Sequence, residues 1–315
     1  MADLNRAAAL LRGWDNILIL SHRSPDGDTL GCASALSRAL LALGKAVQFR
    51  CADPVPKNMA YLFDGVAYGD FEPEHIVTVD VADKALLGTL EPLGARVDLA
   101  IDHHGTHRPF ARESWVDDTA GAACQMIYKL VQAMGVEITP EIADCLYTGI
   151  STDTGCFRYS NASSETHRIA ASLLACGAHA ADINRVMFDT KSRAAVELLK
   201  HVYNDMEFYF DGRCAVLCLT RAMLAETGAG ESELTGVSSL VRQVEGVLFG
   251  LTIQERGENE YKISMRSTAP ASAQAVCARF GGGGHTYAAG CTMHAPLEEV
   301  KAQIVAACGE ALESL

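Results

Sequence analysis

The chain has 315 residues, of which 49% are hydrophobic and 21% charged, and its formal net charge is −13. This length allows two domains, and the composition is that of a globular protein with a sizeable core. Proteins that bind long nucleic-acid duplexes usually present a basic surface, so the acidic balance argues against that class. A small anionic substrate held by metal ions and a few arginines is compatible with it.

The first third of the chain alternates between predicted strands and helices. Strand-like runs at residues 17–20, 46–51, 76–81 and 97–101 are separated by helical or turn-rich stretches, the longest at 29–43. This alternation predicts an α/β fold with a mostly parallel, doubly wound sheet covered on both faces. Ligands of such sheets bind at the carboxyl ends of the strands.

Three of these predicted strands end in acidic or histidine side chains. They are His22, Asp26 and Asp28 after the first strand, Asp80 after the third, and Asp102, His103 and His104 after the fourth. A parallel sheet would bring these strand ends together. Oxygen and imidazole donors in this combination suit Mn²⁺, Mg²⁺ or Zn²⁺. Taken alone, Asp26 and Asp28 could equally shape a turn and cap the next helix.

Helical patterns follow at residues 120–134, 139–150 and 163–176, with Asp153 in a Ser/Thr/Gly-rich stretch after the second. Phe157 and Tyr159 could stack on a base, although an aromatic residue after a helix is more often part of the core. We expect residues 188–206 to form a helical connector between a domain of residues 1–187 and a smaller α/β domain of residues 207–315. Predicted strands of that domain are 213–219, 247–255, 260–265 and 291–294, with helices at 270–280 and 297–312.

Two features of the second half could bind phosphate. Arg266 ends a predicted strand, where it could clamp a terminal phosphate or make a surface salt bridge. Four glycines at 281–284 allow close approach of the backbone to a ligand, and their N–H groups could form an anion-binding nest. A flexible turn is the simpler interpretation of these glycines.

Eleven cysteines are scattered through apolar patterns without a CxxC pair. They indicate free thiols, and we therefore expect the protein in the reducing cytoplasm. Residues 1–13 are predicted to form a short amphipathic helix. No apolar run is long enough to span a bilayer.

Four sequence signatures together resemble those of the DHH phosphoesterase superfamily. They are SHRSPDGDTLG at 21–31, TVD at 78–80, DHH at 102–104 and GISTDTGCF at 149–157. SMRS at 264–267 and GGGGH at 281–285 resemble the DHH-associated C-terminal domain. In length the chain looks most like the NrnA-type members, which degrade very short RNA and dephosphorylate 3′-phosphoadenosine 5′-phosphate. RecJ nucleases share the motifs but usually carry extra DNA-binding domains.

The resemblance implies a phosphoesterase with two divalent cations, Mn²⁺ first and Mg²⁺ or Co²⁺ as alternatives, and a metal-bridging hydroxide as nucleophile. One cation would be held by His22, Asp26 and Asp80, and the other by Asp28, Asp80, His103 and Asp153. His104 would contact the scissile phosphate, and Asp102 would orient a histidine. Substrate contacts in a cleft between the domains would come from Arg266, Gly282, Gly283, Gly284 and His285.

Other functions stay open at this point. Hydrolysis of cyclic or linear dinucleotides is the main alternative. A second alternative is an inactive nucleotide-binding module, but such a protein would have lost metal ligands, and here every metal-ligand position is filled. Relatives often carry Asn where this chain has His107, and a Ser/Thr-rich helix start where it has residues 119–123, so the shape of the pocket is not fixed. The expected partner is short single-stranded RNA or a small nucleotide, without long duplexes or membranes, and a homodimer is possible.

Overall fold

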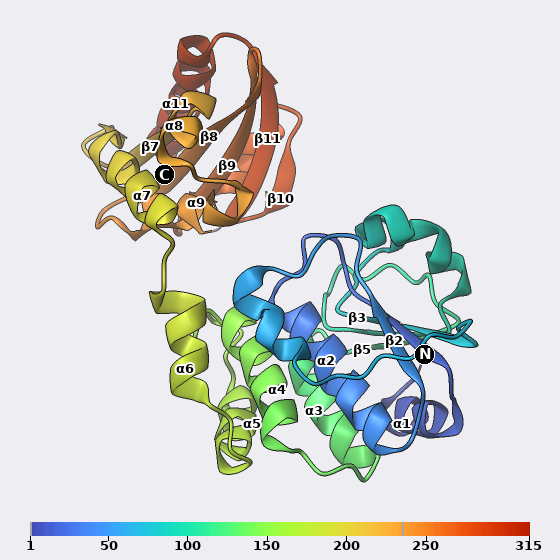
Figure 1. Ribbon diagram of the computed structural model, residues 1–315. Helices are drawn as coiled ribbons and strands as arrows, with labels where there is room; N and C mark the ends of the chain where they lie inside the picture. The colour runs from blue at the N-terminus through green and yellow to red at the C-terminus, as the bar shows by residue number, and fades with distance from the viewer. Residues whose placement is uncertain (1, 235) are drawn as a thin grey trace. The chain divides into compact units, whose positions relative to one another are not determined.

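Figure 1 shows a computed structural model of the protein, which describes residues 2–234 and 236–315. The chain divides into two compact units, Met1–Thr190 and Lys191–Leu315. The division falls inside residues 188–206, the range predicted for the connector. Helix α7 (Arg193–Asn204) of that range is counted in the second unit. Within the described residues, no helix is long and apolar enough to cross a bilayer.

The first unit is built on a five-stranded sheet in the order β2-β1-β3-β4-β5, and all of its pairings are parallel. Its strands are β1 (Ile17–Leu20), β2 (Val47–Arg50), β3 (His75–Val79), β4 (Leu99–Asp102) and β5 (Glu113–Val116). The predicted parallel α/β fold is confirmed. The edge strand β5 was not predicted, because its sequence ESWV contains only two apolar residues and is flanked by charged ones.

The two faces of this sheet have different covers. Alternate residues of a strand point to opposite faces, so Ile17 and Ile19 join one cluster while Leu18 and Leu20 join another. The first cluster lies beneath the helices α1 (Leu4–Gly13), α2 (Gly27–Ala42), α3 (Ala123–Ala133) and α4 (Pro140–Asp153). The second lies beneath the 3₁₀-helical segment Lys84–Arg96.

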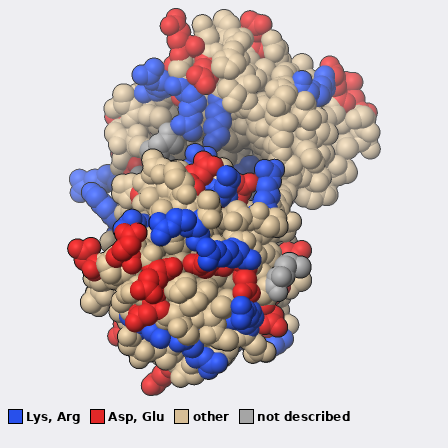
Figure 2. Space-filling view, turned by 90° about the vertical axis from the view of Figure 1, so that its right-hand side faces the viewer, with Lys and Arg blue, Asp and Glu red and all other residues tan. Residues whose placement is uncertain are grey.

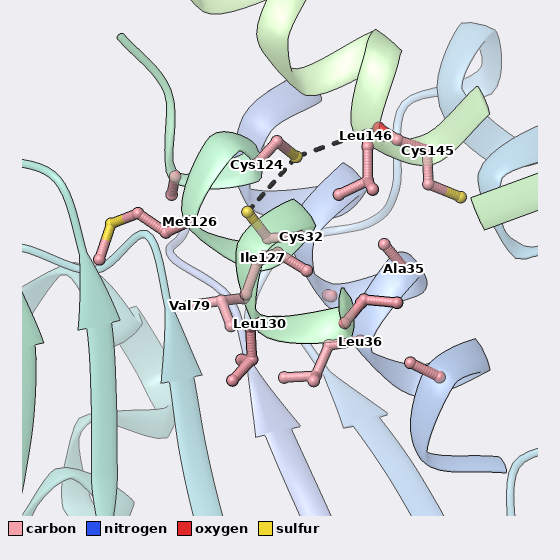
Figure 3. Packing of buried hydrophobic residues seen from close by; sticks show 14 of the residues in the cluster. Cys32, Ala35, Leu36, Val79, Cys124, Met126, Ile127, Leu130, Cys145 and Leu146 are labelled. Atoms are coloured by element: carbon pink, nitrogen blue, oxygen red, sulfur yellow. Dashed lines mark hydrogen bonds between the residues drawn. The ribbon is translucent and has the colours of Figure 1, made fainter. Parts of the chain in front are cut away.

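The helices that cover the first cluster pack closely because small residues lie where they cross. A Cβ added to Gly31 of α2 would overlap the carbonyl oxygen of Cys145 on α4. Figure 3 shows the core between these helices and the sheet, where Cys32 of α2 lies beside Cys124 of α3. Short side chains therefore bring the N-terminus of α2 close to α3 and α4.

Two helix boundaries place acidic residues differently from the sequence prediction. Helix α2 begins at Gly27, because Asp26 caps it by accepting from the N–H groups of Asp28 and Thr29 at 3.1 Å each. Asp28 is therefore in the first helical turn rather than in a loop. Helix α4 is capped by Thr139 as predicted, but it continues to Asp153, which forms its last residue.

The second unit contains a six-stranded mixed sheet in the order β10-β11-β9-β8-β7-β6, in which β7 and β8 form the parallel pair. Its strands are β6 (Glu207–Tyr209), β7 (Cys214–Leu219), β8 (Phe249–Gly257), β9 (Glu260–Ser267), β10 (Gly283–His285) and β11 (Ala288–His294). Helices α10 (Ala273–Ala278) and α11 (Leu297–Glu313) pack on one face. Helices α7, α8 (Arg221–Thr227) and α9 (Val237–Leu240) pack against β7 on the other.

The glycine-rich segment forms an edge strand rather than a loop. Gly283 pairs with Gly290, and His285 pairs with Ala288, in an antiparallel hairpin. A Cβ at Gly284, whose φ is +139°, would lie 2.5 Å from the carbonyl oxygen of Ala288. Close packing of the hairpin thus accounts for this glycine without any ligand.

Charged side chains of both signs share the surface. Figure 2 shows Lys and Arg side chains interspersed with Asp and Glu over the visible face. The net charge of −13 is therefore not gathered into a single acidic patch on that face.

Candidate metal and active site

Acidic and histidine side chains meet at one edge of the first sheet. The neighbouring strands β1, β3 and β4 all end there, and Asp153 at the end of α4 joins them. Their donor atoms form overlapping groups whose members lie within 4.8 Å of one another: His22, Asp26 and Asp80; Asp28, His103 and Asp153; and Asp80, His103 and His104. The structure thus brings together all six residues predicted as metal ligands.

The spacing of these atoms suits cation ligands better than direct hydrogen bonds. Nε2 of His103 lies 3.4 Å from Asp80, 3.6 Å from Asp153 and 3.7 Å from Asp28, measured to one carboxylate oxygen each. His22 Nε2 lies 3.6 Å from Asp80 Oδ2 and 3.7 Å from Asp26 Oδ1. Atoms that each lie about 2.0–2.2 Å from a shared ion are separated by roughly 3–3.5 Å. The residues present therefore fit divalent cations.

Asp80 is the residue common to both halves of this cluster. Its side chain is 3% exposed, and Oδ1 has no hydrogen-bond partner among the described residues. Its backbone φ is +59°, an unfavourable value for a residue with a Cβ. A buried carboxylate oxygen without a donor is costly, and a bound cation would remove that cost.

Asp28 is held by the N-terminus of a helix that lacks a cap of its own. Residue 122, where the side chain of an N-cap would lie, is alanine. The Asp28 carboxylate accepts instead from the N–H of Ala123 at 2.6 Å and of Cys124 at 2.9 Å. This contact explains how α3 begins without a capping side chain of its own. Since each carboxylate oxygen has two lone pairs, Asp28 can accept these bonds and still bind a cation.

Asp102 organises the histidines that follow it. It is fully buried and accepts from Nδ1 of His104 at 2.8 Å and from Nδ1 of His107 at 2.6 Å. His104 is 43% exposed and His107 only 5%. The sequence left the role of His107 open. The structure shows that it fills the second oxygen of Asp102, so that both oxygens have donors.

The electrostatics of the cluster require positive charge. Burial lowers the pKa of His22 and of His103, but the surrounding carboxylates outweigh it and raise these values to about 11 and about 10. Burial raises the pKa of Asp153 to about 6, and it also raises the pKa of Asp28 well above its usual range. Protons on the histidines balance the carboxylates, and divalent cations would replace those protons.

The predicted substrate contacts of the second unit lie on its sheet. Arg266 is on β9, where its guanidinium donates to the carbonyl of Met265 at 3.1 Å, and its backbone pairs with Ala288. Gly283, Gly284 and His285 form β10, an exposed strand, and Gly282 precedes it. Arg266 and His285 both pair with Ala288, so they belong to adjoining positions of the same sheet.

Comparison with known proteins agrees with these features. Residues 16–150 match the DHH family, N-terminal domain, and residues 212–314 match the DHHA1 domain. A bifunctional oligoribonuclease and PAP phosphatase NrnA from Thermus thermophilus is 36% identical over 283 residues, covering 88% of this chain and 84% of the relative. The Bacillus subtilis protein of the same name is 24% identical, covering 89% and 90%.

Solved structures share the fold. An exopolyphosphatase-related protein from Bacteroides fragilis superimposes with a TM-score of 0.86 at 25% identity, covering 99% of this chain and 96% of that one. RecJ from Thermus thermophilus, solved in complex with Mn²⁺, gives a TM-score of 0.55 at 19% identity, covering 97% of this chain and 54% of RecJ. At that identity the likeness to RecJ concerns the fold alone.

Proposed function

The chain belongs to the DHH family, and from this premise we propose that it is a phosphoesterase using two divalent cations to hydrolyse short RNA oligonucleotides and the terminal phosphate of 3′-phosphoadenosine 5′-phosphate. The relative from Thermus thermophilus, named for both activities, supports this substrate class. The observation that carries the proposal is the grouping of buried carboxylates and histidines around Asp80 at the edge of the sheet.

The donor set divides naturally into two cation sites that share Asp80. His22 and Asp26 form one group with Asp80, and Asp28, His103 and Asp153 form another. Nε2 of His22 lies 3.6 Å from Oδ2 of Asp80, whereas Nε2 of His103 lies 3.4 Å from Oδ1. Bound cations of this kind supply a nucleophile at neutral pH and neutralise negative charge on the phosphate. Mn²⁺ is the first choice because carboxylate oxygens with some imidazole suit it, and Mg²⁺ or Co²⁺ are alternatives.

In this proposal His104 acts on the substrate rather than on a cation, and Asp102 orients it. The hydrogen bond from Nδ1 of His104 to Asp102 fixes the proton on that nitrogen, which leaves Nε2 as the ring atom that can contact a phosphate oxygen. Asp102 also raises the pKa of His104. His104 would therefore contact the phosphate through Nε2, as a protonated imidazole ring that carries a positive charge and donates a hydrogen bond.

The second unit would bind the part of the substrate that does not react. Arg266 offers a guanidinium for a phosphate. In the exposed strand of residues 283–285, Gly283 has nothing within 4 Å of an added Cβ, so a ligand can approach the backbone there, next to Gly282, Gly284 and His285. The cytoplasm is the proposed compartment, since all eleven cysteines are free thiols, as expected under reducing conditions.

A substrate panel tests the proposal. The full chain is assayed with Mn²⁺ on an RNA dinucleotide, 3′-phosphoadenosine 5′-phosphate, a cyclic dinucleotide and pyrophosphate. The highest kcat/KM is expected on the first two, with activity lost in EDTA and restored by Mn²⁺. Preference for the cyclic dinucleotide or for pyrophosphate would overturn the substrate class, and activity that survives EDTA would overturn the role of the cations.

A further inference from the structure

Tyr159, in the loop after Asp153, has an exposed ring beside the candidate active site. We propose that this ring is the surface on which a base of the substrate stacks, so that Tyr159 distinguishes nucleotides from other phosphate esters. The inference rests on the proposed function and adds to it a residue for recognition of the base. It concerns the first unit by itself.

The ring is supported on one side and open on the other. Gly155 is buried beneath it: a Cβ at Gly155 would lie 2.7 Å from Cε1 of Tyr159 and closer still to Cζ. Tyr159 as a whole is 52% exposed. Among the described residues, its hydroxyl makes no hydrogen bond and its ring has no aromatic partner. An aromatic plane fixed against backbone, with its other face in solvent, is the arrangement used to stack bases.

The loop that carries the ring is fixed in place. Gly155, Cys156 and Phe157 have φ values of +57°, +57° and +62°, a left-handed run that is unfavourable for residues with a Cβ and needs support from its surroundings. The N–H of Tyr159 donates to the carbonyl of Thr154 at 3.1 Å, and Arg158 Nε donates to the carbonyl of Gly155 at 2.6 Å. The ring is therefore presented by a defined turn.

The same loop is bonded to the walls of the candidate metal site. Nδ2 of Asn161 donates to the carbonyl of Asp153 at 3.2 Å and to that of Gly121 at 2.9 Å. Ala120, next to Gly121, accepts from Nδ1 of His103 at 3.1 Å. Gly155 follows Asp153 by two residues, so its Cα lies no more than about 7.6 Å from that of Asp153. The ring lies against Gly155 and is therefore near Asp153, as a base one sugar away from its phosphate would require.

The other aromatic residue of the loop does not compete for this role. Phe157 packs against Tyr147 and His167, with ring centroids 5.9 Å and 5.4 Å apart. It belongs to the core, as is usual for an aromatic residue after a helix. Of the two aromatics predicted from the sequence as able to stack on a base, Tyr159 alone offers an open face.

The test compares two ligands that differ only in the base. Binding of adenosine 5′-monophosphate and of ribose 5-phosphate to the full chain with Mn²⁺ is measured by titration calorimetry. Wild type should bind the nucleotide about tenfold more tightly than the sugar phosphate. Tyr159→Ala and Tyr159→Leu should remove this preference and leave ribose 5-phosphate affinity unchanged, whereas Tyr159→Phe should retain it. In the dinucleotide assay, Tyr159→Leu should raise KM rather than lower kcat.

The variants separate stacking from a structural role. Leucine still covers Gly155 but offers no aromatic plane, so a preference retained by Tyr159→Leu would overturn the proposal. Equal loss of affinity for both ligands would also overturn it, because the residue would then only support the loop. Tyr203→Ala, which removes a tyrosine that is 62% exposed in the second unit, is the matched control. A base preference that depends on Tyr159 without any hydrolysis would overturn the proposed activity but not this inference.

Discussion

Asp80 combines three properties that are individually unusual for a buried aspartate. Its φ is positive, one carboxylate oxygen has no donor among the described residues, and three histidines lie within 3.6 Å, among them His22 and His103. His22 and His103 hold the pKa of Asp80 below its usual range even though burial raises it. We expect Asp80→Asn to lose Mn²⁺ binding and hydrolysis, since an amide keeps the shape but supplies no charge to either cation. Titration calorimetry and the dinucleotide assay measure both losses.

A matched control for this variant is Asp98→Asn. Asp98 is also buried in the first unit, but its carboxylate accepts from the N–H of Ile76 at 3.1 Å and from Arg112 at 2.8 Å. That variant should lose stability, by about 1–3 kcal/mol, and still bind Mn²⁺. Near-normal Mn²⁺ binding by Asp80→Asn would contradict the assignment of Asp80 as the shared ligand.

The histidines of the cluster predict how cation binding depends on pH. With pKa values raised from 6.5 to about 11 for His22 and about 10 for His103, both carry protons at neutral pH when no cation is bound. A cation needs them deprotonated, so binding releases protons and affinity falls as the pH falls. We expect about two protons released per protein, about one per histidine. Calorimetry at pH 7.5 in buffers of different ionisation enthalpy counts them. Affinity that is constant between pH 6 and pH 8 would count against both histidines as ligands.

At the scale of elements, the crossing of α2 and α4 determines where Asp28 lies. A Cβ on Gly149 of α4 would lie 2.7 Å from Oδ1 of Asp28 and would overlap Sγ of Cys124. Gly149→Ala must therefore push α2 or α3 away, which should cost about 1–3 kcal/mol of stability and weaken Mn²⁺ binding. Urea unfolding in EDTA and calorimetry measure the two effects. Gly13→Ala in α1, where a Cβ has nothing within 4 Å, is the control. Unchanged stability in Gly149→Ala would show that the helices can separate at little cost.

Elements with strong local patterns were predictable, and elements held by distant contacts were not. The strands β1, β3 and β4 contain apolar runs, β2 alternates apolar and polar residues, and Thr139-Pro140 marks the start of α4. β10 consists of two glycines and a histidine, whose side chains carry no strand pattern. The start of α3 depends on Asp28, 95 residues earlier in the chain, and no local motif reveals that contact.

The candidate site was predictable in composition but not in all its contacts. Motifs identified the six candidate ligand residues, which the fold brings together. The pairing of His107 with Asp102 could not be inferred, since a histidine in a Gly-Thr-His-Arg stretch has no distinctive pattern. Likewise, Phe157 and Tyr159 are equivalent in sequence, and only the tertiary structure packs one ring against the core and exposes the other.

At the scale of the whole molecule, net charge bears on how long a substrate can be. A short oligonucleotide places few phosphates on the protein, whereas a long strand must extend over a surface whose net charge is −13. The positive side chains visible in Figure 2 lie among negative ones, so a long strand would on average be repelled. We therefore expect kcat/KM to be highest for RNA of about two to five nucleotides and to fall steeply beyond that length.

The salt dependence of this length series identifies its cause. Repulsion between exposed charges is screened as ionic strength rises, because the Debye length falls from about 30 Å at 0.01 M to about 10 Å at 0.1 M. If repulsion disfavours long strands, the ratio of kcat/KM for a dinucleotide to that for a 24-nucleotide RNA should shrink over this range of salt. If long RNA is instead disfavoured because the substrate end must fit into a closed site, this ratio should stay constant as the salt concentration changes. Equal efficiency on all lengths at every salt concentration would contradict the short-RNA substrate class and favour a processive, RecJ-like nuclease.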